Sequence, residues 1–142
     1  MEEYNRVSSF IQAFLRENNS LLEEIREEAQ KDAVPIIRDE TAALLRVCLE
    51  INKPKSILEL GTAVGYSALL MLDCLDGGAS LTTVENFPER IRKAEENFQR
   101  SPYKERISLL EGDAGKILKE LVREERHFDF VFLDAAKAQY PI

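Results

Sequence analysis

The stretch of sequence that decides the fold is Ser56-Ile57-Leu58-Glu59-Leu60-Gly61-Thr62-Ala63-Val64-Gly65-Tyr66-Ser67. Its first half is short and apolar and stops at a glycine, which is typical of a buried strand in a parallel sheet. Gly61 and Gly65 permit a tight turn, and they let a ligand approach the backbone N–H groups at the start of the following helix. A plain strand-to-helix turn often contains one glycine, so two glycines behind an acidic residue favour a ligand site.

The rest of the chain continues this pattern of strand and helix. We expect strands at 56–60, 80–85, 106–111 and 128–133, and helices at 66–75, 88–100 and 115–125. Strands and helices that alternate at this spacing predict a parallel sheet with right-handed crossovers. The predicted fold class is therefore α/β, a doubly wound parallel sheet of which only the first four strands are present.

The first part of the chain, residues 1–53, is predicted to be a helical segment that packs on the same domain as residues 54–142. An apolar stripe indicates an amphipathic helix from Tyr4 to about Asn18. A second helix is expected after Ser20, which we interpret as its N-cap in a capping box with Glu23. Pro35 predicts an extended connector at 33–37, and a third helix is expected from about Asp39 until just before Pro54.

Length, charge and cysteine content exclude some classes of protein. With 142 residues the chain is one domain or part of one. A net charge of −7 argues against nonspecific coating of nucleic acid, but it leaves room for an enzyme that holds one RNA with a local basic patch. No apolar run approaches the roughly 18 residues of a membrane span, and the acidic N-terminus is unlike a secretory signal. Cys48 and Cys74 are predicted to be buried thiols, which favours a reducing compartment and so the cytoplasm.

The glycine-containing turn does not match the nicotinamide fingerprint, because Ala63 stands where the middle glycine is required. Glu59 is expected to place a carboxylate beneath the ligand, where it would repel a pyrophosphate and favour positive charge. S-adenosylmethionine carries a sulfonium and an ammonium group, so the sign of its charge fits.

Further acids follow the next two predicted strands. Glu85 stands twenty residues after Gly65, where it can accept hydrogen bonds from the ribose hydroxyls of an adenosine, or can act as the acidic residue before a helix. Asp113 can accept a hydrogen bond from the adenine amino group, cap the following helix, or do both.

The fourth predicted strand ends in Leu133-Asp134-Ala135-Ala136-Lys137. A carboxylate that leaves a buried strand for the ligand crevice binds a cation or positions a substrate. Lys137 can reach the same site, and beside a divalent cation its pKa would fall towards that of a general base. The alternative is an ordinary solvated Asp and Lys in a loop. His127, the only histidine, is given no role.

Residues 57–67 resemble motif I of class I S-adenosylmethionine-dependent methyltransferases, and are most similar to the cation-dependent O-methyltransferases of the catechol and caffeoyl-CoA type. Residues 132–137 resemble the D-x-x-K segment of that family, in which the Asp ligates Mg²⁺ and the Lys acts on the acceptor hydroxyl. The lead helices and Val34-Pro35-Ile36-Ile37 are most similar to the bacterial branch that methylates 5-hydroxyuridine at the wobble position of tRNA.

The resemblance implies a Rossmann-like methyltransferase that forms a homodimer. It implies tRNA or a small hydroxylated aromatic as the methyl acceptor, and no membrane partner. It implies a Mg²⁺ ligand at Asp134, catalytic roles for Asp134 and Lys137, and an S-adenosylmethionine site made by Ile37, Glu59, Gly61, Gly65, Ser67, Glu85, Asp113, Ala114 and Asp134.

The chain also departs from this family, whose members have seven strands and carry their other metal ligands, an Asp-Asn pair, at the end of the fifth strand. It ends eight residues past Asp134, so we expect it to be a truncated form of a longer enzyme. Three functions stay open: tRNA 5-hydroxyuridine methylation with Mg²⁺ assistance, methylation of a catechol-like or caffeoyl-CoA-like small molecule, and an inactive cofactor-binding module.

Overall fold

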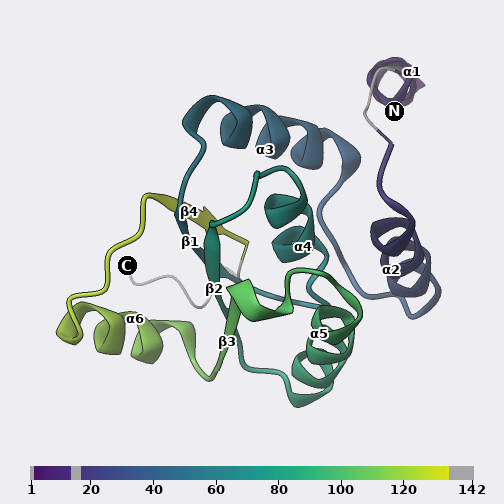
Figure 1. The fold of residues 1–142 in the computed structure, drawn as a ribbon. Helices are drawn as coiled ribbons and strands as arrows, with labels where there is room; N and C mark the ends of the chain where they lie inside the picture. Colours follow the sequence, from purple (N-terminus) through teal and green to yellow (C-terminus); the bar gives the residue numbers. More distant parts are fainter. Residues whose placement is uncertain (1, 14–16, 135–142) are drawn as a thin grey trace.

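The computed structural model describes residues 2–13 and 17–134, and its ribbon is drawn in Figure 1. The chain begins with three helices and continues with alternating strands and helices. The elements are α1 (Glu2–Gln12), α2 (Ser20–Lys31), α3 (Asp39–Asn52), β1 (Ser56–Leu60), α4 (Tyr66–Asp73), β2 (Ser80–Glu85), α5 (Pro88–Arg100), the short 3₁₀ helix η1 (Lys104–Arg106), β3 (Ile107–Glu111), α6 (Ala114–Arg123) and β4 (Phe130–Leu133).

The four strands form one parallel sheet in the order β3-β2-β1-β4. The chain moves outward from β1 through β2 to β3 and then returns to the other side of β1 to add β4. The strand order therefore reverses at β1, and in open sheets of this kind ligands bind beside the carboxyl ends of the strands at that reversal. The predicted fold class, a doubly wound α/β sheet of four strands, is confirmed.

The sheet is covered on both faces, which explains why β1 is buried continuously from Ile57 to Leu60 rather than at alternate residues. Figure 1 shows α6 on one side of the sheet and α4 and α5 on the other. Leu58 and Leu60 pack with buried residues of α6, whereas Ile57 belongs to the larger core that α2, α3, α4 and α5 share. Helix α4 is buried from Tyr66 to Leu72, so the helix that follows the glycine-containing turn is anchored on all sides.

Two predictions about the helical segment are wrong, one about the start of α2 and one about the end of α1. The N-cap of α2 is Asn19, not Ser20, because the Asn19 side chain accepts a hydrogen bond from the backbone N–H of Leu22 over 2.9 Å. Glu23 does not complete a capping box with Ser20, and it accepts a hydrogen bond from the amide of Asn18 instead. The first helix ends at Gln12, short of the predicted Asn18.

Other predicted boundaries are off by a few residues for local reasons. The fourth strand begins at Phe130, because the carboxylate of Asp129 accepts hydrogen bonds from the backbone N–H groups of Lys55 and Ser56 over 2.9 and 2.8 Å before the ladder starts. The prediction of two buried thiols is wrong, since the side chains of Cys48 and Cys74 are of intermediate exposure. Within the described part of the chain, no helix combines the length and apolar character that crossing a membrane requires.

Candidate functional site

A cavity of about 360 Å³ lies at the carboxyl ends of the strands. It is lined by the connector before α3, the turn after β1, the end of β2, the start of α5, the start of α6 and the residue after β4. Five of the residues predicted for the cofactor site line it together: Ile37, Gly61, Glu85, Ala114 and Asp134. The reversal of strand order brings them to one place although they are far apart in the sequence.

The turn after β1 has a backbone that few residues can adopt. Gly61, Ala63 and Gly65 all have positive φ angles, of 99°, 48° and 85°. Gly61 lines the cavity, whereas Gly65 is the N-cap of α4 and faces α5. A Cβ atom on Gly65 would lie 2.5 Å from the Phe98 ring, so the second glycine allows α5 to pack closely against the turn. Gly65 therefore affects the site through the packing of α5, although it does not line the cavity.

Glu85, at the end of β2, connects three segments of the site. It is 5% exposed, and Oε2 accepts a hydrogen bond from the N–H of Ala63 over 2.9 Å. Oε1 accepts from the N–H groups of Asn86 and Phe87 over 2.9 and 3.2 Å. A carboxylate has about four acceptor positions, so this group can stay bonded to the backbone and still accept a ligand hydroxyl. The role of Glu85 towards ribose remains a prediction.

Glu59 lies within the sheet and not on the cavity wall. It is fully buried, and its oxygens accept hydrogen bonds from the hydroxyl groups of Ser67 over 2.5 Å and Thr83 over 2.6 Å. Burial raises the pKa of Glu59 to about 7; the two hydroxyl groups lower it, and the charges of Asp134 and Glu85 raise it further. Near neutral pH this carboxyl group is therefore close to its midpoint of ionisation.

Sequence reasoning missed the part of this network that β2 supplies. The Thr83 hydroxyl also pairs with that of Thr62 over 2.6 Å, and both threonines are buried. The signal that could have found it is a pair of threonines, Thr82 and Thr83, in a strand predicted to lie inside the sheet. Ser67, predicted to contact the cofactor, donates to Glu59 and does not line the cavity.

Asp113 is the N-cap of α6, and its side chain accepts a hydrogen bond from the N–H of Lys116 over 3.0 Å. The capping interpretation of Asp113 is confirmed. Its neighbours Gly112 and Ala114 line the cavity, but the Asp113 side chain does not. The contact between Asp113 and an adenine amino group stays a prediction.

Asp134 lines the cavity immediately after β4, and its backbone N–H donates to the carbonyl oxygen of Leu60 over 2.9 Å. Desolvation by neighbouring groups raises the pKa of its carboxyl group, although the residue as a whole is exposed. Among residues 2–13 and 17–134, no group of three or more His, Cys, Asp or Glu side chains could hold a metal ion. Lys137 lies outside the described residues.

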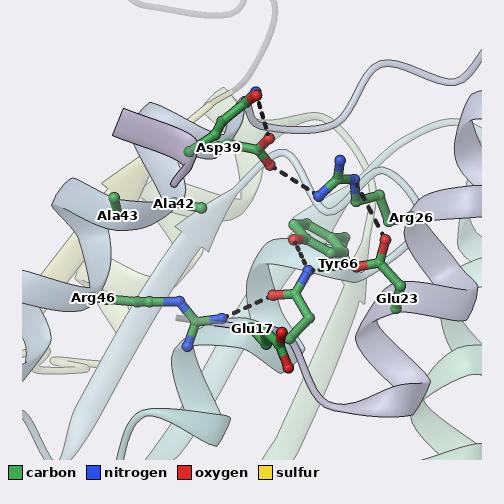
Figure 2. Close-up of a pocket in the computed structure, with 10 residues that line it drawn as sticks. Glu17, Glu23, Arg26, Asp39, Ala42, Ala43, Arg46 and Tyr66 are labelled. Carbon is green, nitrogen blue, oxygen red and sulfur yellow. Dashed lines mark hydrogen bonds and ion pairs between the residues drawn. The ribbon is translucent and has the colours of Figure 1, made fainter. Parts of the chain in front are cut away.

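A second cavity, of about 440 Å³, lies where α1, α2, α3 and the start of α4 meet (Figure 2). The amide of Asn18 donates to the Tyr66 hydroxyl over 3.1 Å, and Arg46 donates to the amide oxygen of Asn18 over 2.9 Å. Arg26 pairs with Asp39 over 3.2 Å in the same cluster. Because Tyr66 is the first residue of α4, these contacts tie the lead helices to the residue that follows the glycine-containing turn.

Known proteins are similar to this chain in sequence and in fold. The O-methyltransferase family matches residues 12–142. A protein of Niastella koreensis named catechol O-methyltransferase is 33% identical over 129 residues, which are 90% of this chain and 56% of that protein.

Two solved structures resemble the chain closely. The SAH-bound methyltransferase PaMTH1 of Podospora anserina has a TM-score of 0.88 and 31% identity, covering 98% of this chain and 60% of that one. The O-methyltransferase of Bacillus cereus in complex with SAH has a TM-score of 0.82 and 27% identity, covering 93% of this chain and 61% of that one. The chain spans about three fifths of the length of the proteins it matches. It belongs to the O-methyltransferase family.

Proposed function

We propose that this protein binds S-adenosylmethionine in the cavity at the strand ends and transfers its methyl group to a hydroxyl oxygen. The observation that carries the proposal is the set of five residues around that cavity, Ile37, Gly61, Glu85, Ala114 and Asp134, at the point where the strand order reverses. Two similar structures are complexes with SAH, the demethylated product of this cofactor, which supports the same ligand class here.

The acidic side chains of the cavity suit the positively charged groups of this cofactor. Glu85 and Asp134 are the acidic side chains on its wall, within the part of the chain that the structure describes, and Glu59 lies buried nearby. Negative groups favour a ligand with a sulfonium and an ammonium group over a pyrophosphate. Glu85 also retains acceptor capacity for the ribose hydroxyls, since its present donors are backbone N–H groups.

Methyl transfer requires mainly alignment from the protein. The carbon–sulfur bond of the sulfonium breaks as a carbon–oxygen bond forms in line with it, and the acceptor hydroxyl loses its proton. Asp134 lies at the end of β4 on the cavity wall, where it can position an acceptor hydroxyl. Lys137 is our proposed base for the proton, on the strength of the resemblance of residues 132–137 to the D-x-x-K segment.

The described residues do not by themselves fit a Mg²⁺ site. Asp134 supplies one carboxylate at the predicted position, and Mg²⁺ prefers nearly octahedral coordination by oxygen. Magnesium assistance therefore stays a prediction that rests on Asp134 alone.

For the acceptor we propose 5-hydroxyuridine at the tRNA wobble position, because Val34-Pro35-Ile36-Ile37 resembles that branch and three of these residues line the cavity. A catechol-like acceptor is the second candidate, favoured by the name of the Niastella koreensis relative. Methylation assays on hypomodified tRNA and on a simple catechol separate the two. If the chain bound SAH but methylated neither tRNA nor the catechol, the inactive cofactor-binding module would be favoured.

The cofactor proposal is tested by calorimetric titration of SAH into this chain. We expect binding that Glu85→Gln weakens at least about tenfold, the loss of one charge-assisted hydrogen bond. The matched control is Glu111→Gln: Glu111 is the register partner of Glu85 on β3, is exposed, and is not on the cavity wall. Failure of a folded wild-type chain to bind SAH would contradict the proposal, as would equal losses in both variants.

A further inference from the structure

Glu59 is a buried acid that the proposed methyl transfer does not use. It lies on the inner strand β1, two residues before Gly61, where the cavity wall begins. Its oxygens accept hydrogen bonds from the hydroxyl groups of Ser67 on α4 and Thr83 on β2, and no described Lys, Arg or His forms an ion pair with it. The ionisation of a buried carboxyl group without a cationic partner depends strongly on any positive charge that a ligand brings near it.

The hydrogen bonds of Glu59 accommodate both of its protonation states. Thr83 donates to Oε1 over 2.6 Å, so the hydrogen between Thr62 and Thr83, whose oxygens are 2.6 Å apart, comes from Thr62. Ser67 donates to Oε2 over 2.5 Å. When the carboxyl group takes up a proton, its O–H can donate to Ser67, because a hydroxyl oxygen also accepts. Neither state leaves a carboxyl oxygen unpaired, so the proton can leave or return without disrupting the core.

The same hydroxyl groups connect Glu59 to the cavity wall. Thr62, at the far end of the network, stands between Gly61 and Ala63, and both of these neighbours line the cavity. Thr62 and Thr83 are buried. Protein rather than water therefore separates Glu59 from a ligand in the cavity, and the interaction between their charges is weakly screened.

The charged groups around Glu59 leave its state of ionisation balanced. The carboxylates of Glu85 on β2 and Asp134 after β4 favour its protonated form, and burial does so more strongly, so that the pKa of Glu59 is about 7. Arg38 and Arg90 are the basic side chains on the cavity wall among the described residues. Near pH 7 the carboxyl group is therefore about half protonated, and one further positive charge in the cavity can decide its state.

We propose that Glu59 distinguishes S-adenosylmethionine from its demethylated product by charge: the carboxyl group loses its proton to solvent when the sulfonium occupies the cavity and keeps it when the sulfur is neutral. The two ligands differ by one methyl group and one positive charge, and a carboxylate stabilises the ligand with the extra charge preferentially. A rise in pH therefore favours the cofactor over SAH. The inference rests on the proposed function, and it gives the choice between cofactor and product to a residue that does not line the cavity.

The test is calorimetric titration of S-adenosylmethionine and of SAH into this chain, with EDTA present so that no metal changes the charge of Asp134. At pH 7, two buffers of different ionisation enthalpy give the number of protons released on binding. We expect the wild type to release about 0.4 more protons than Glu59→Gln when it binds S-adenosylmethionine, and nearly the same number when it binds SAH.

The pH dependence of the two affinities gives a second measurement. From pH 6 to pH 8, the affinity for S-adenosylmethionine relative to that for SAH should rise about five- to tenfold more in the wild type than in Glu59→Gln. The amino groups of the ligands titrate with both proteins, so the comparison with the variant removes their contribution.

Thr83→Val tests the same inference with Glu59 in place. It removes one hydroxyl donor to the carboxylate and so raises the pKa of Glu59, which should move the rise in the affinity ratio to higher pH. Thr82→Val is the matched control, because Thr82 is the neighbouring buried threonine of β2 and its hydroxyl accepts from Arg126 over 3.4 Å. Its pH profile should follow that of the wild type. Circular dichroism establishes that each variant is folded.

Three results overturn the inference: equal proton release by wild type and Glu59→Gln with S-adenosylmethionine, the same pH dependence of the affinity ratio in these two proteins, or a pH profile of Thr83→Val that coincides with that of Thr82→Val. Failure of the folded wild type to bind either ligand would instead contradict the proposed function, so the two failures are distinguishable.

Discussion

The Thr83 hydroxyl donates a hydrogen bond to Oε1 of Glu59 over 2.6 Å, and the two residues are direct register partners on the neighbouring strands β2 and β1. Ser67 donates to the other oxygen over 2.5 Å, so both oxygens of a fully buried carboxyl group are bonded. These hydroxyl groups lower the pKa of Glu59, but burial outweighs them and raises it to about 7. The centre of the sheet thus contains a group that titrates near neutral pH.

Glu59 is expected to make the stability of the fold depend on pH. Its pKa is about 7 in the folded chain and near the ordinary 4.5 in the unfolded one, so stability falls as pH rises from about 4.5 to about 7. Glu59→Gln has nearly the same shape and stays neutral, so its stability should not fall over this pH range. Its free energy of unfolding should exceed that of the wild type by about 1 to 3 kcal/mol between pH 5 and pH 8. Urea unfolding at several pH values measures it.

The control for this comparison is Glu111→Gln, an exposed acid at the end of β3. Its unfolding free energy should follow that of the wild type across the same pH range. If the unfolding free energies of wild type and Glu59→Gln changed in parallel with pH, Glu59 would not titrate in this pH range.

The packing of α5 against the glycine-containing turn predicts a large cost for Gly65→Ala. The backbone there has φ +85°, and a Cβ would lie 2.5 Å from the buried Phe98 ring. Strain and overpacking together should lower the free energy of unfolding by about 2 to 4 kcal/mol. Gly77→Ala is the control, because no heavy atom lies within 4 Å of a Cβ at that position and its φ is not positive. Equal stability of the two variants in urea would argue against the close packing.

The pattern of apolar runs and glycines was enough to predict β1, its turn and the alternation that follows, because these features depend on neighbouring residues. The same reasoning placed Glu85 and Asp134 at one end of the sheet, since parallel strands end on the same side. Contacts such as Thr83–Glu59 and Asn18–Tyr66 join positions 24 and 48 residues apart. Only the packed fold brings such pairs together, which is why the sequence did not reveal them.

The cap of α6 predicts a graded response at Asp113. Its side chain accepts from the N–H of Lys116 over 3.0 Å, and removing such a cap costs about 1 kcal/mol. Asp113→Ala should lose about that much unfolding free energy, whereas Asp113→Asn, whose amide oxygen can accept the same bond, should lose much less. Chemical denaturation of both variants tests this. Equal losses would mean that the carboxylate contributes through its charge rather than as a cap.

The cluster in Figure 2 predicts that Asn18 stabilises the start of α4. Asn18→Ala removes the donor to the Tyr66 hydroxyl and the acceptor for Arg46, and Tyr66 is only 3% exposed. Leaving such buried groups unpaired should cost about 1 to 3 kcal/mol of unfolding free energy. Tyr66→Phe should cost less, because it removes the buried hydroxyl itself and does not leave it without a partner. Asn52→Ala is the control, because Asn52 is exposed and its amide donates to the carbonyl of Cys48 within its own helix. If urea unfolding gave Asn18→Ala and Asn52→Ala the same small loss, the cluster would not anchor the lead helices to α4.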